Sequence, residues 1–182
     1  MSQLQSQKPN STLDSHVKKV ISGERKFENV YQAVSGMILG GDDKIEKVTV
    51  NGRPTYDFKV FRKPGKHIVG MFDEVNSFVS FVKDAAEGGS SREMAFILIG
   101  EPGNGKTYFV DYLNKLYRDF VSLPENMRYT FKYKYLDKIE GYGKITAIES
   151  QTYEDPMILA MNIFDNDDEC KAYLSKLGAS DS

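Results

Sequence analysis

Apolar side chains recur every three or four residues in several stretches of this chain. The longest of these stretches are residues 27–39, 71–86 and 107–121. Because positions three and four apart lie on one face of a helix, this spacing predicts amphipathic helices. On the helix over 107–121 we expect the inner side to consist of Tyr108, Val110, Leu113, Leu116 and Tyr117. Shorter helices are expected at 14–22, 156–164 and 169–177, and Pro156 suits the first turn of its helix.

Alternation of apolar and polar residues predicts strands elsewhere. Asn51-Gly52 lies between two alternating runs, 45–50 and 56–61, and this combination indicates a β hairpin. Residues 95–99 instead form a continuous apolar run, as expected of a buried strand in a parallel sheet. Two further strands are expected at 129–136 and 144–149. A strand followed by a helix and two strands indicates an α/β domain with a parallel sheet, to which the hairpin is an appendage.

The composition limits which binding partners and which cellular compartment are expected for this chain. The chain has 182 residues, enough for one domain with a core, and its formal net charge is -2. This balance lacks the excess of Lys and Arg with which nucleic-acid binders displace counterions. Cys170 is the only cysteine, so no intrachain disulfide can form, which fits a reducing, cytoplasmic setting. No apolar run approaches the ~20 residues of a membrane span, and residues 1–15 are interpreted as a polar, disordered leader.

The sequence GEPGNGKT at 100–107 satisfies the phosphate-binding pattern G-x-x-x-x-G-K-[ST], known as Walker A. It follows an apolar run and opens a predicted helix, which is the context that this motif needs. Glycines let the backbone wrap closely around a phosphate chain, and a helix N-terminus offers unpaired N–H groups with a partial positive charge. Lys106 can reach the β- and γ-phosphates, and the Thr107 hydroxyl can be one ligand of Mg²⁺.

These residue types predict a site for ATP and Mg²⁺, with Thr107 as the metal ligand. The expected nucleotide contacts from this motif are Gly100, Glu101, Pro102, Gly103, Asn104, Gly105, Lys106, Thr107 and Tyr108. A glycine-rich turn from strand to helix that binds nothing is the alternative interpretation.

With this motif in place, the flanking residues resemble the N-terminal AAA+ domain of PrkA-type bacterial serine protein kinases. The resemblance runs from about Arg25 to Asn162 and rests on short segments in matching order and spacing. Besides the Walker A loop these segments are RKFENVYQA at 25–33, residues 56–61, VGMFDE at 69–74 and YEDPMIL at 153–159. The resemblance implies a P-loop NTPase (AAA+) three-layer core with a parallel sheet, preceded by helices and a β hairpin, that binds ATP.

The resemblance also implies a division of the chain. Its expected parts are the leader 1–15, an N-terminal extension over 16–66 and an AAA+ core over 67–182 that is truncated before the Walker B strand. In such domains the stretch at 67–70 commonly lines the adenine pocket, which adds Val69 and Gly70 to the expected ATP contacts. A plain loop with Ile68 and Val69 as core residues is the alternative. PrkA proteins carry their kinase-like region in a C-terminal domain, so the catalytic residues are unknown and little or no hydrolysis is expected from this chain alone.

Two acidic side chains are alternatives for a Walker B role. Glu149 ends an apolar strand, whereas Asp165 follows an apolar run that Pro156 favours as a helix. Lysines and aromatic residues also alternate over 129–144, which resembles a stacking surface for nucleic acid. In the simpler interpretation the aromatic rings face the core of a sheet and the lysines face water. The acidic run 165–169 is interpreted as a helix N-terminus rather than a Ca²⁺ loop.

Three functions stay open on the sequence. The leading hypothesis is an ATP·Mg-binding AAA+ domain of a PrkA-like serine protein kinase, acting as regulator or motor. The second is an ATP-stabilised protein-interaction module whose helices 28–39 and 71–86 bind a partner. The third, a self-sufficient P-loop ATPase, is disfavoured by the lack of a convincing Walker B. The expected partners are ATP and an unidentified protein, with homo-oligomerisation through an unpaired strand edge and neither nucleic acid nor membrane.

Overall fold

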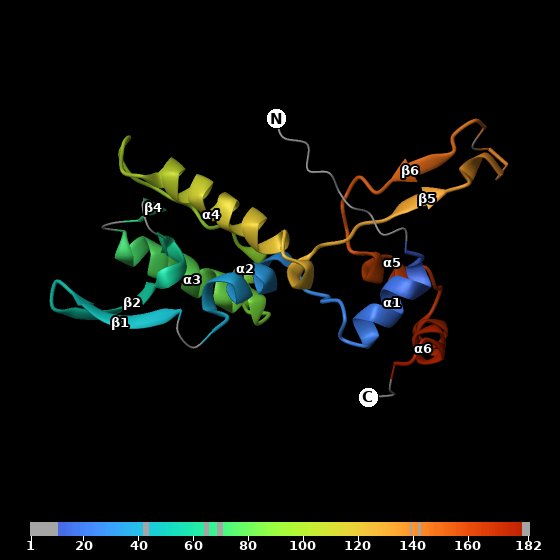
Figure 1. Cartoon of the computed structure of the whole chain (residues 1–182), viewed down its shortest axis with the longest axis horizontal. Helices are drawn as coiled ribbons and strands as arrows, with labels where there is room; N and C mark the ends of the chain where they lie inside the picture. The colour runs from blue at the N-terminus through green and yellow to red at the C-terminus, as the bar shows by residue number, and fades with distance from the viewer. Residues whose placement is uncertain are drawn as a thin grey trace. The chain divides into compact units, whose positions relative to one another are not determined.

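The computed structural model describes residues 11–41, 44–63, 66–68, 71–138, 140–141 and 143–179. The chain forms two compact units, one over Glu28–Leu123 and one over Met1–Phe27 with Pro124–Ser182. We call the first the inserted unit, because it interrupts the sequence of the second, which we call the terminal unit. Figure 1 labels the α helices and most strands of both units.

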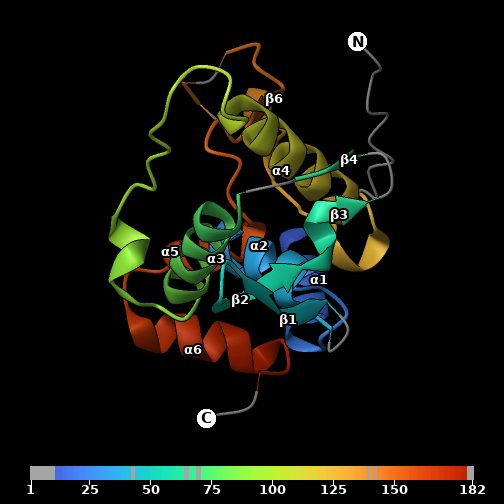
Figure 2. The ribbon, with the colours of Figure 1, turned by 90° about the vertical axis from the view of Figure 1, so that its left-hand side faces the viewer.

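Three helices frame the inserted unit: α2 (Val30–Leu39), α3 (Phe72–Ala86) and α4 (Lys106–Val121). Each coincides with a stretch of helical spacing, so these predicted helices are confirmed. A capping box starts α2, since the side chains of Asn29 and Gln32 each accept a hydrogen bond from the other's backbone N–H. α2 lies beside α3, and the short 3-10 helix η2 (Ser90–Glu93) follows α3 (Figure 2).

The core of the inserted unit gathers side chains from all three helices and from the end of the hairpin. Its buried members are Met37, Ile38, Phe58, Phe61, Val75, Val79, Phe109, Tyr112 and Leu116. The predicted inner side of α4 is therefore wrong in part, because Tyr108 and Val110 are 46% and 44% exposed. Phe109 is buried instead, with its ring against those of Phe61 and Phe78. Burying a large aromatic ring among others favours this rotation of the helix over one that buries Val110.

The predicted hairpin is confirmed, although its second strand ends at Phe58 and does not extend to residue 61. β1 (Ile45–Val50) pairs antiparallel with β2 (Arg53–Phe58), and Asn51 and Gly52 form the turn with φ of 51° and 76°. Helix α3 holds the outer edge of β2 through Asn76. Its Nδ2 donates to the carbonyl oxygen of Tyr56 at 2.7 Å, and its Oδ1 accepts from the Tyr56 N–H at 3.3 Å. The amide side chain thus satisfies backbone groups that a neighbouring strand would otherwise satisfy.

A short connection follows β2. It comprises the 3-10 helix η1 (Lys59–Phe61) and the two-residue strands β3 (Arg62–Lys63) and β4 (Lys66–His67), which pair antiparallel. This connection leads toward α3.

The strand predicted at 95–99 is not formed. The segment between η2 and α4 has no regular secondary structure and pairs with no described strand (Figure 2). Leu98 packs against the core and Phe96 is half-buried, whereas Ile97 and Ile99 are 72% and 90% exposed. One side of this apolar run therefore faces solvent, where a parallel sheet would have covered both.

The described residues of the terminal unit form three α helices, α1 (Leu13–Ile21), α5 (Pro156–Asn162) and α6 (Asp167–Lys176), as predicted. α1 starts slightly before its predicted range, because the Thr12 hydroxyl accepts the N–H of Ser15. Asp155 caps α5 by accepting the Met157 N–H at 2.8 Å, and Pro156 occupies the first turn. The buried side chains of Val17, Met157 and Ala160 form a small core, against which residues of α6 pack.

A second hairpin belongs to the terminal unit. β5 (Lys132–Lys134) pairs antiparallel with β6 (Ala147–Glu149). The 3-10 helix η3 (Pro124–Asn126) precedes it, and η4 (Leu136–Lys138) lies in its connection. The expectation that alternation buries the aromatic rings is wrong for Tyr133 and Tyr135, which are 48% and 65% exposed, whereas Phe131 is half-buried. A two-stranded ladder alone does not supply a second layer over its aromatic face.

These ladders correct the predicted fold class. All sheets among the described residues are two-stranded and antiparallel, in the pairs β1–β2, β3–β4 and β5–β6. The described part of the chain therefore contains no parallel sheet and no three-layer P-loop core. The physical reason is that residues 95–99 have no strand neighbours, while the strands after α4 pair with each other as a hairpin.

Candidate functional site

The loop predicted to bind phosphate precedes α4 in the inserted unit. Gly103 and Gly105 adopt φ of +88° and +75°, values that strain any residue with a Cβ. Gly105 is also the N-cap residue of α4 and makes no side-chain cap, and the first turn of α4 has no acidic residue. The first N–H groups of the helix thus lack a side-chain cap, and together with the helix dipole they favour an anion.

Lys106 is folded back over this loop. Its Nζ donates hydrogen bonds to the carbonyl oxygens of Gly100 and Glu101, each at 2.6 Å. One ammonium group therefore ties the beginning of the loop to the first residue of α4. Neutral carbonyls hold it in this position, and a phosphate would offer it acceptor oxygens that also carry negative charge.

The other predicted contacts surround this lysine. Residues 100–104 and Thr107 are exposed, and so is Tyr108, so ligand atoms can reach them. The Thr107 hydroxyl, one position beyond Lys106 on α4, is accessible to a metal ion. Val69 and Gly70, the expected adenine contacts, lie outside the described residues.

The segment at the start of α3 approaches the loop. A Cβ built on Gly105 would lie 3.5 Å from the sulfur of Met71. Met71 and Ile68 also line a small cavity of about 20 Å³, enough for one water molecule and too small for a purine ring. The buried carboxylate of Asp57 lines the same cavity. Its Oδ2 lies 2.6 Å from Arg62 Nε, so the two side chains form an ion pair, but the angle at the nitrogen does not suit a hydrogen bond.

The two acidic residues weighed for a Walker B role both belong to the terminal unit. Glu149 lies in β6 opposite Lys132 of β5, and Asp165 is exposed between α5 and α6. The acidic run that follows Asp165 forms the first turn of α6, capped by Asn166, which confirms its interpretation as a helix N-terminus. Nowhere in the described ranges do three or more His, Cys, Asp or Glu side chains gather as a metal site.

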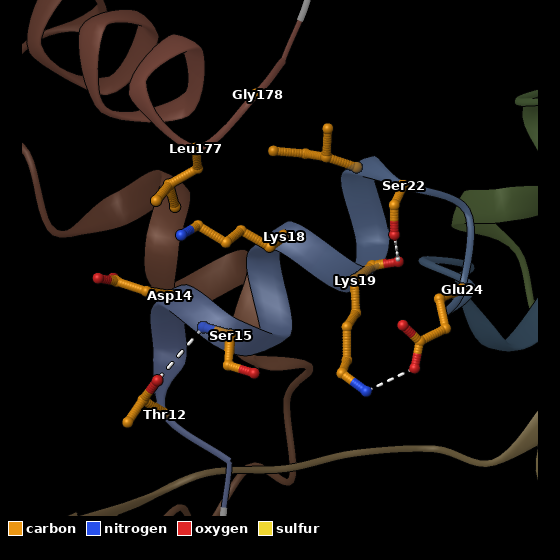
Figure 3. A pocket seen from close by; sticks show the side chains of 10 residues that line it. Thr12, Asp14, Ser15, Lys18, Lys19, Ser22, Glu24, Leu177 and Gly178 are labelled. Carbon is orange, nitrogen blue, oxygen red and sulfur yellow. Dashed lines mark hydrogen bonds and ion pairs between the residues drawn. The ribbon is translucent and has the colours of Figure 1, made fainter.

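An open depression lies between α1 and the end of α6 in the terminal unit (Figure 3). Lysines and carboxylates both line it, so its charge is mixed. Lys19 is paired with Glu24, and Asp14 accepts a hydrogen bond from the Tyr173 hydroxyl at 2.6 Å. The side chains that line this depression therefore do not converge on one ligand chemistry, and we assign it no ligand.

Sequence reasoning missed a polar cluster around His16 in the terminal unit. The sequence analysis assigned no role to this histidine, and it is a buried side chain, 3% exposed. It contacts Asp155, Arg25 and the ring of Tyr129. The one available signal was a histidine on the apolar face of a short helix, because its partners are up to 139 positions away in the sequence.

No protein-family model, curated protein or solved structure matches this chain. Within the described part of the chain, every helix is too short or too polar to cross a membrane.

Proposed function

We propose that this chain binds the phosphates of Mg·ATP through residues 100–107. The observation that carries the proposal is the position of Lys106, whose ammonium lies over the loop at the start of α4. Phosphate oxygens would replace the carbonyl oxygens of Gly100 and Glu101 as its partners. Binding then needs a movement of one flexible side chain rather than of the helix.

The backbone supports the same proposal. Left-handed φ values at Gly103 and Gly105 bend the chain in front of α4, and no side chain caps this end of the helix. Backbone N–H groups in such a bend form a concave anion site. Thr107 would supply one oxygen to Mg²⁺, with the phosphates and water as its remaining ligands.

Binding without rapid hydrolysis is the expected behaviour. Phosphoryl transfer needs an oriented nucleophile and neutralisation of the charge that develops on the transferred group. Lys106 can neutralise charge on the transferred group, but the carboxylates weighed for orienting the nucleophile, Glu149 and Asp165, belong to the terminal unit. We therefore propose an ATP-binding part of a PrkA-type serine protein kinase, in a cytoplasmic setting, whose phosphotransfer residues are not assigned. This family assignment rests on the sequence resemblance alone.

A second candidate is a protein-interaction module that ATP stabilises. The exposed side chains of Ile97 and Ile99 favour it, because they project from an unpaired segment just before the loop. Helices α2 and α3 favour it less, because their apolar residues pack within the inserted unit. The two candidates differ in whether ATP changes the binding of a partner or only the stability of this chain.

Thermal unfolding in the presence of Mg·ATP tests the leading proposal. A ligand at about 100 times its Kd stabilises the folded state by about 2.7 kcal/mol, which raises the unfolding temperature by a few degrees. We expect this rise for the wild type and for Lys115→Ala, an exposed lysine on the same helix. Lys106→Ala should show little or none of it. An equal rise in Lys106→Ala would place the nucleotide elsewhere, and phosphate release in the same samples would support the ATPase alternative.

A further inference from the structure

The buried cluster around His16 fixes the protonation of that ring by geometry. Arg25 Nη1 lies 2.8 Å from His16 Nδ1, and Asp155 Oδ1 lies 3.0 Å from His16 Nε2. A guanidinium group only donates hydrogen bonds, so Nδ1 must accept and carries no proton. The ring proton is therefore on Nε2, where it is donated to the Asp155 carboxylate.

The same residues join distant parts of the terminal unit. The Arg25 guanidinium lies 3.9 Å from the centre of the Tyr129 ring, and the His16 ring meets Tyr129 edge-on at 5.4 Å. Next to Arg25, Lys26 donates to the side chain of Asn126 at 3.0 Å. α1 is thereby linked through His16 to the segments on both sides of the inserted unit.

Those two segments are the covalent connections between the units. The chain enters the inserted unit after Phe27 and leaves it at Leu123, so Arg25 and Tyr129 lie within a few residues of the two crossings. Within the terminal unit, the contacts of Arg25 and Lys26 hold both connecting segments together. His16 accepts the hydrogen bond that orients Arg25.

We propose that His16 is a proton-sensitive latch, which holds the two connecting segments together when its ring is neutral and releases Arg25 when Nδ1 takes up a proton. A protonated Nδ1 would place two donors 2.8 Å apart at a part-buried contact, beside a ring that is only 3% exposed. The contact between Arg25 and His16 is therefore incompatible with the imidazolium form. Histidine is the side chain that ordinarily changes charge between pH 5 and pH 8.

The groups that face His16 come from several elements. Asp155, at the start of α5, is a carboxylate that can pair with the ring in either form, so it does not oppose release of Arg25. Tyr129, after η3, meets the His16 ring edge-on. α6 also packs against α1, and its Tyr173 hydroxyl donates to Asp14 rather than to His16. Arg25 is thus the partner whose contact depends on the state of Nδ1.

Nuclear magnetic resonance of the full chain tests the latch directly. The background carries His67→Gln, because His16 and His67 are the only histidines in the sequence. Ring nitrogen shifts of His16 report which nitrogen is protonated, and nuclear Overhauser contacts report whether Arg25 still lies against the Tyr129 ring. At pH 7.5 we expect a proton on Nε2 alone and strong Arg25–Tyr129 contacts. By pH 5.0 we expect a doubly protonated ring and loss of most of those contacts.

A matched variant separates the latch from general acid effects. His16→Gln keeps one donor and one acceptor but cannot titrate, so its Tyr129 signals should stay constant between pH 7.5 and pH 5.0. Three results would overturn the proposal: a proton on Nδ1 at pH 7.5, a doubly protonated ring with Arg25–Tyr129 contacts intact, or a ring that stays neutral at pH 5.0. Each can be read from the titration of the His67→Gln protein alone, whether or not His16→Gln folds.

Discussion

The ammonium of Lys106 lies 2.6 Å from the carbonyl oxygen of Gly100, six residues earlier in the chain. This hydrogen bond closes the loop over its own first residue. Under the proposed function, a phosphate would take the place of these carbonyl oxygens as acceptor for the same ammonium. The proposal therefore implies that the loop is arranged before an anion arrives, which would reduce the entropy lost on binding.

The loop glycines should matter through their backbone conformation. Gly103→Ala forces a Cβ into φ of +88°, where nothing lies within 4 Å of it, so only backbone strain is added. We expect a loss of about 1–2 kcal/mol in the free energy of unfolding and weaker nucleotide binding. Gly100→Ala is the matched control, because its Cβ would meet Lys106 Nζ at an ordinary 3.5 Å. Urea denaturation of both variants measures the difference, and equal losses would contradict this assignment.

The two hydrogen bonds between Asn76 and the Tyr56 backbone of β2 should contribute to the stability of the inserted unit. Asn76→Ala leaves the N–H and carbonyl of Tyr56 without these partners, which should lower the free energy of unfolding by about 1–3 kcal/mol. Asn114→Ala makes the same change at an exposed position of α4 and should alter stability by less than about 0.5 kcal/mol. Chemical denaturation of both variants measures their free energies of unfolding, and similar values would show that the Asn76 hydrogen bonds add no stability.

The difference in exposure between Ile99, in the apolar run before the loop, and Ile38, in α2, predicts very different contributions to the free energy of unfolding. Ile99 is 90% exposed, so Ile99→Ala should change the free energy of unfolding by no more than about 0.5 kcal/mol. Ile38 is fully buried in α2, so Ile38→Ala should cost about 2–5 kcal/mol. A large loss for Ile99→Ala, measured in the same denaturant series, would show that this side chain is covered in solution.

The contact between Tyr173 and Asp14 predicts a dependence on alkaline pH. Burial and the neighbouring Asp14 raise the pKa of the Tyr173 hydroxyl to about 12, above its ordinary value near 10. The folded state therefore holds this proton more tightly than the unfolded state, and the associated stability is complete below pH 10 and lost as pH rises toward 12. Asp14→Asn should lower the pKa, and resonance titration of the Tyr173 ring measures it. An unchanged titration would exclude Asp14 as a cause.

Local patterns predicted much of the secondary structure. Asn51-Gly52 has few alternatives to a hairpin turn, and Asp155 before Pro156 defines a helix start through capping and a fixed φ. Such signals act within a few residues, so they hold whatever the rest of the chain does. Gly103 and Gly105 of the Walker A pattern belong to the same class, since their left-handed φ values follow from the motif.

Tertiary relationships were predicted less well, for reasons visible in particular residues. The apolar run at 95–99 suits a buried strand, but burial needs neighbouring strands that the described chain does not place there. On α4, Tyr108 and Phe109 are both large and aromatic, so spacing alone did not decide which of them faces inward. The partners of His16 come from segments far apart in the sequence, and no short pattern joins them.

Isothermal titration of Mg·ATP into three proteins, the wild type, Lys106→Ala and Lys115→Ala, tests the central claim most directly. A charge-assisted hydrogen bond contributes about 1.5–3 kcal/mol, so removing Lys106 should weaken binding roughly 10- to 100-fold. Lys115→Ala should bind like the wild type, because its side chain is exposed farther along α4. Saturable binding that only Lys106→Ala loses is the predicted result. Absence of binding to the wild type, or equal binding by all three proteins, would contradict a phosphate site at residues 100–107.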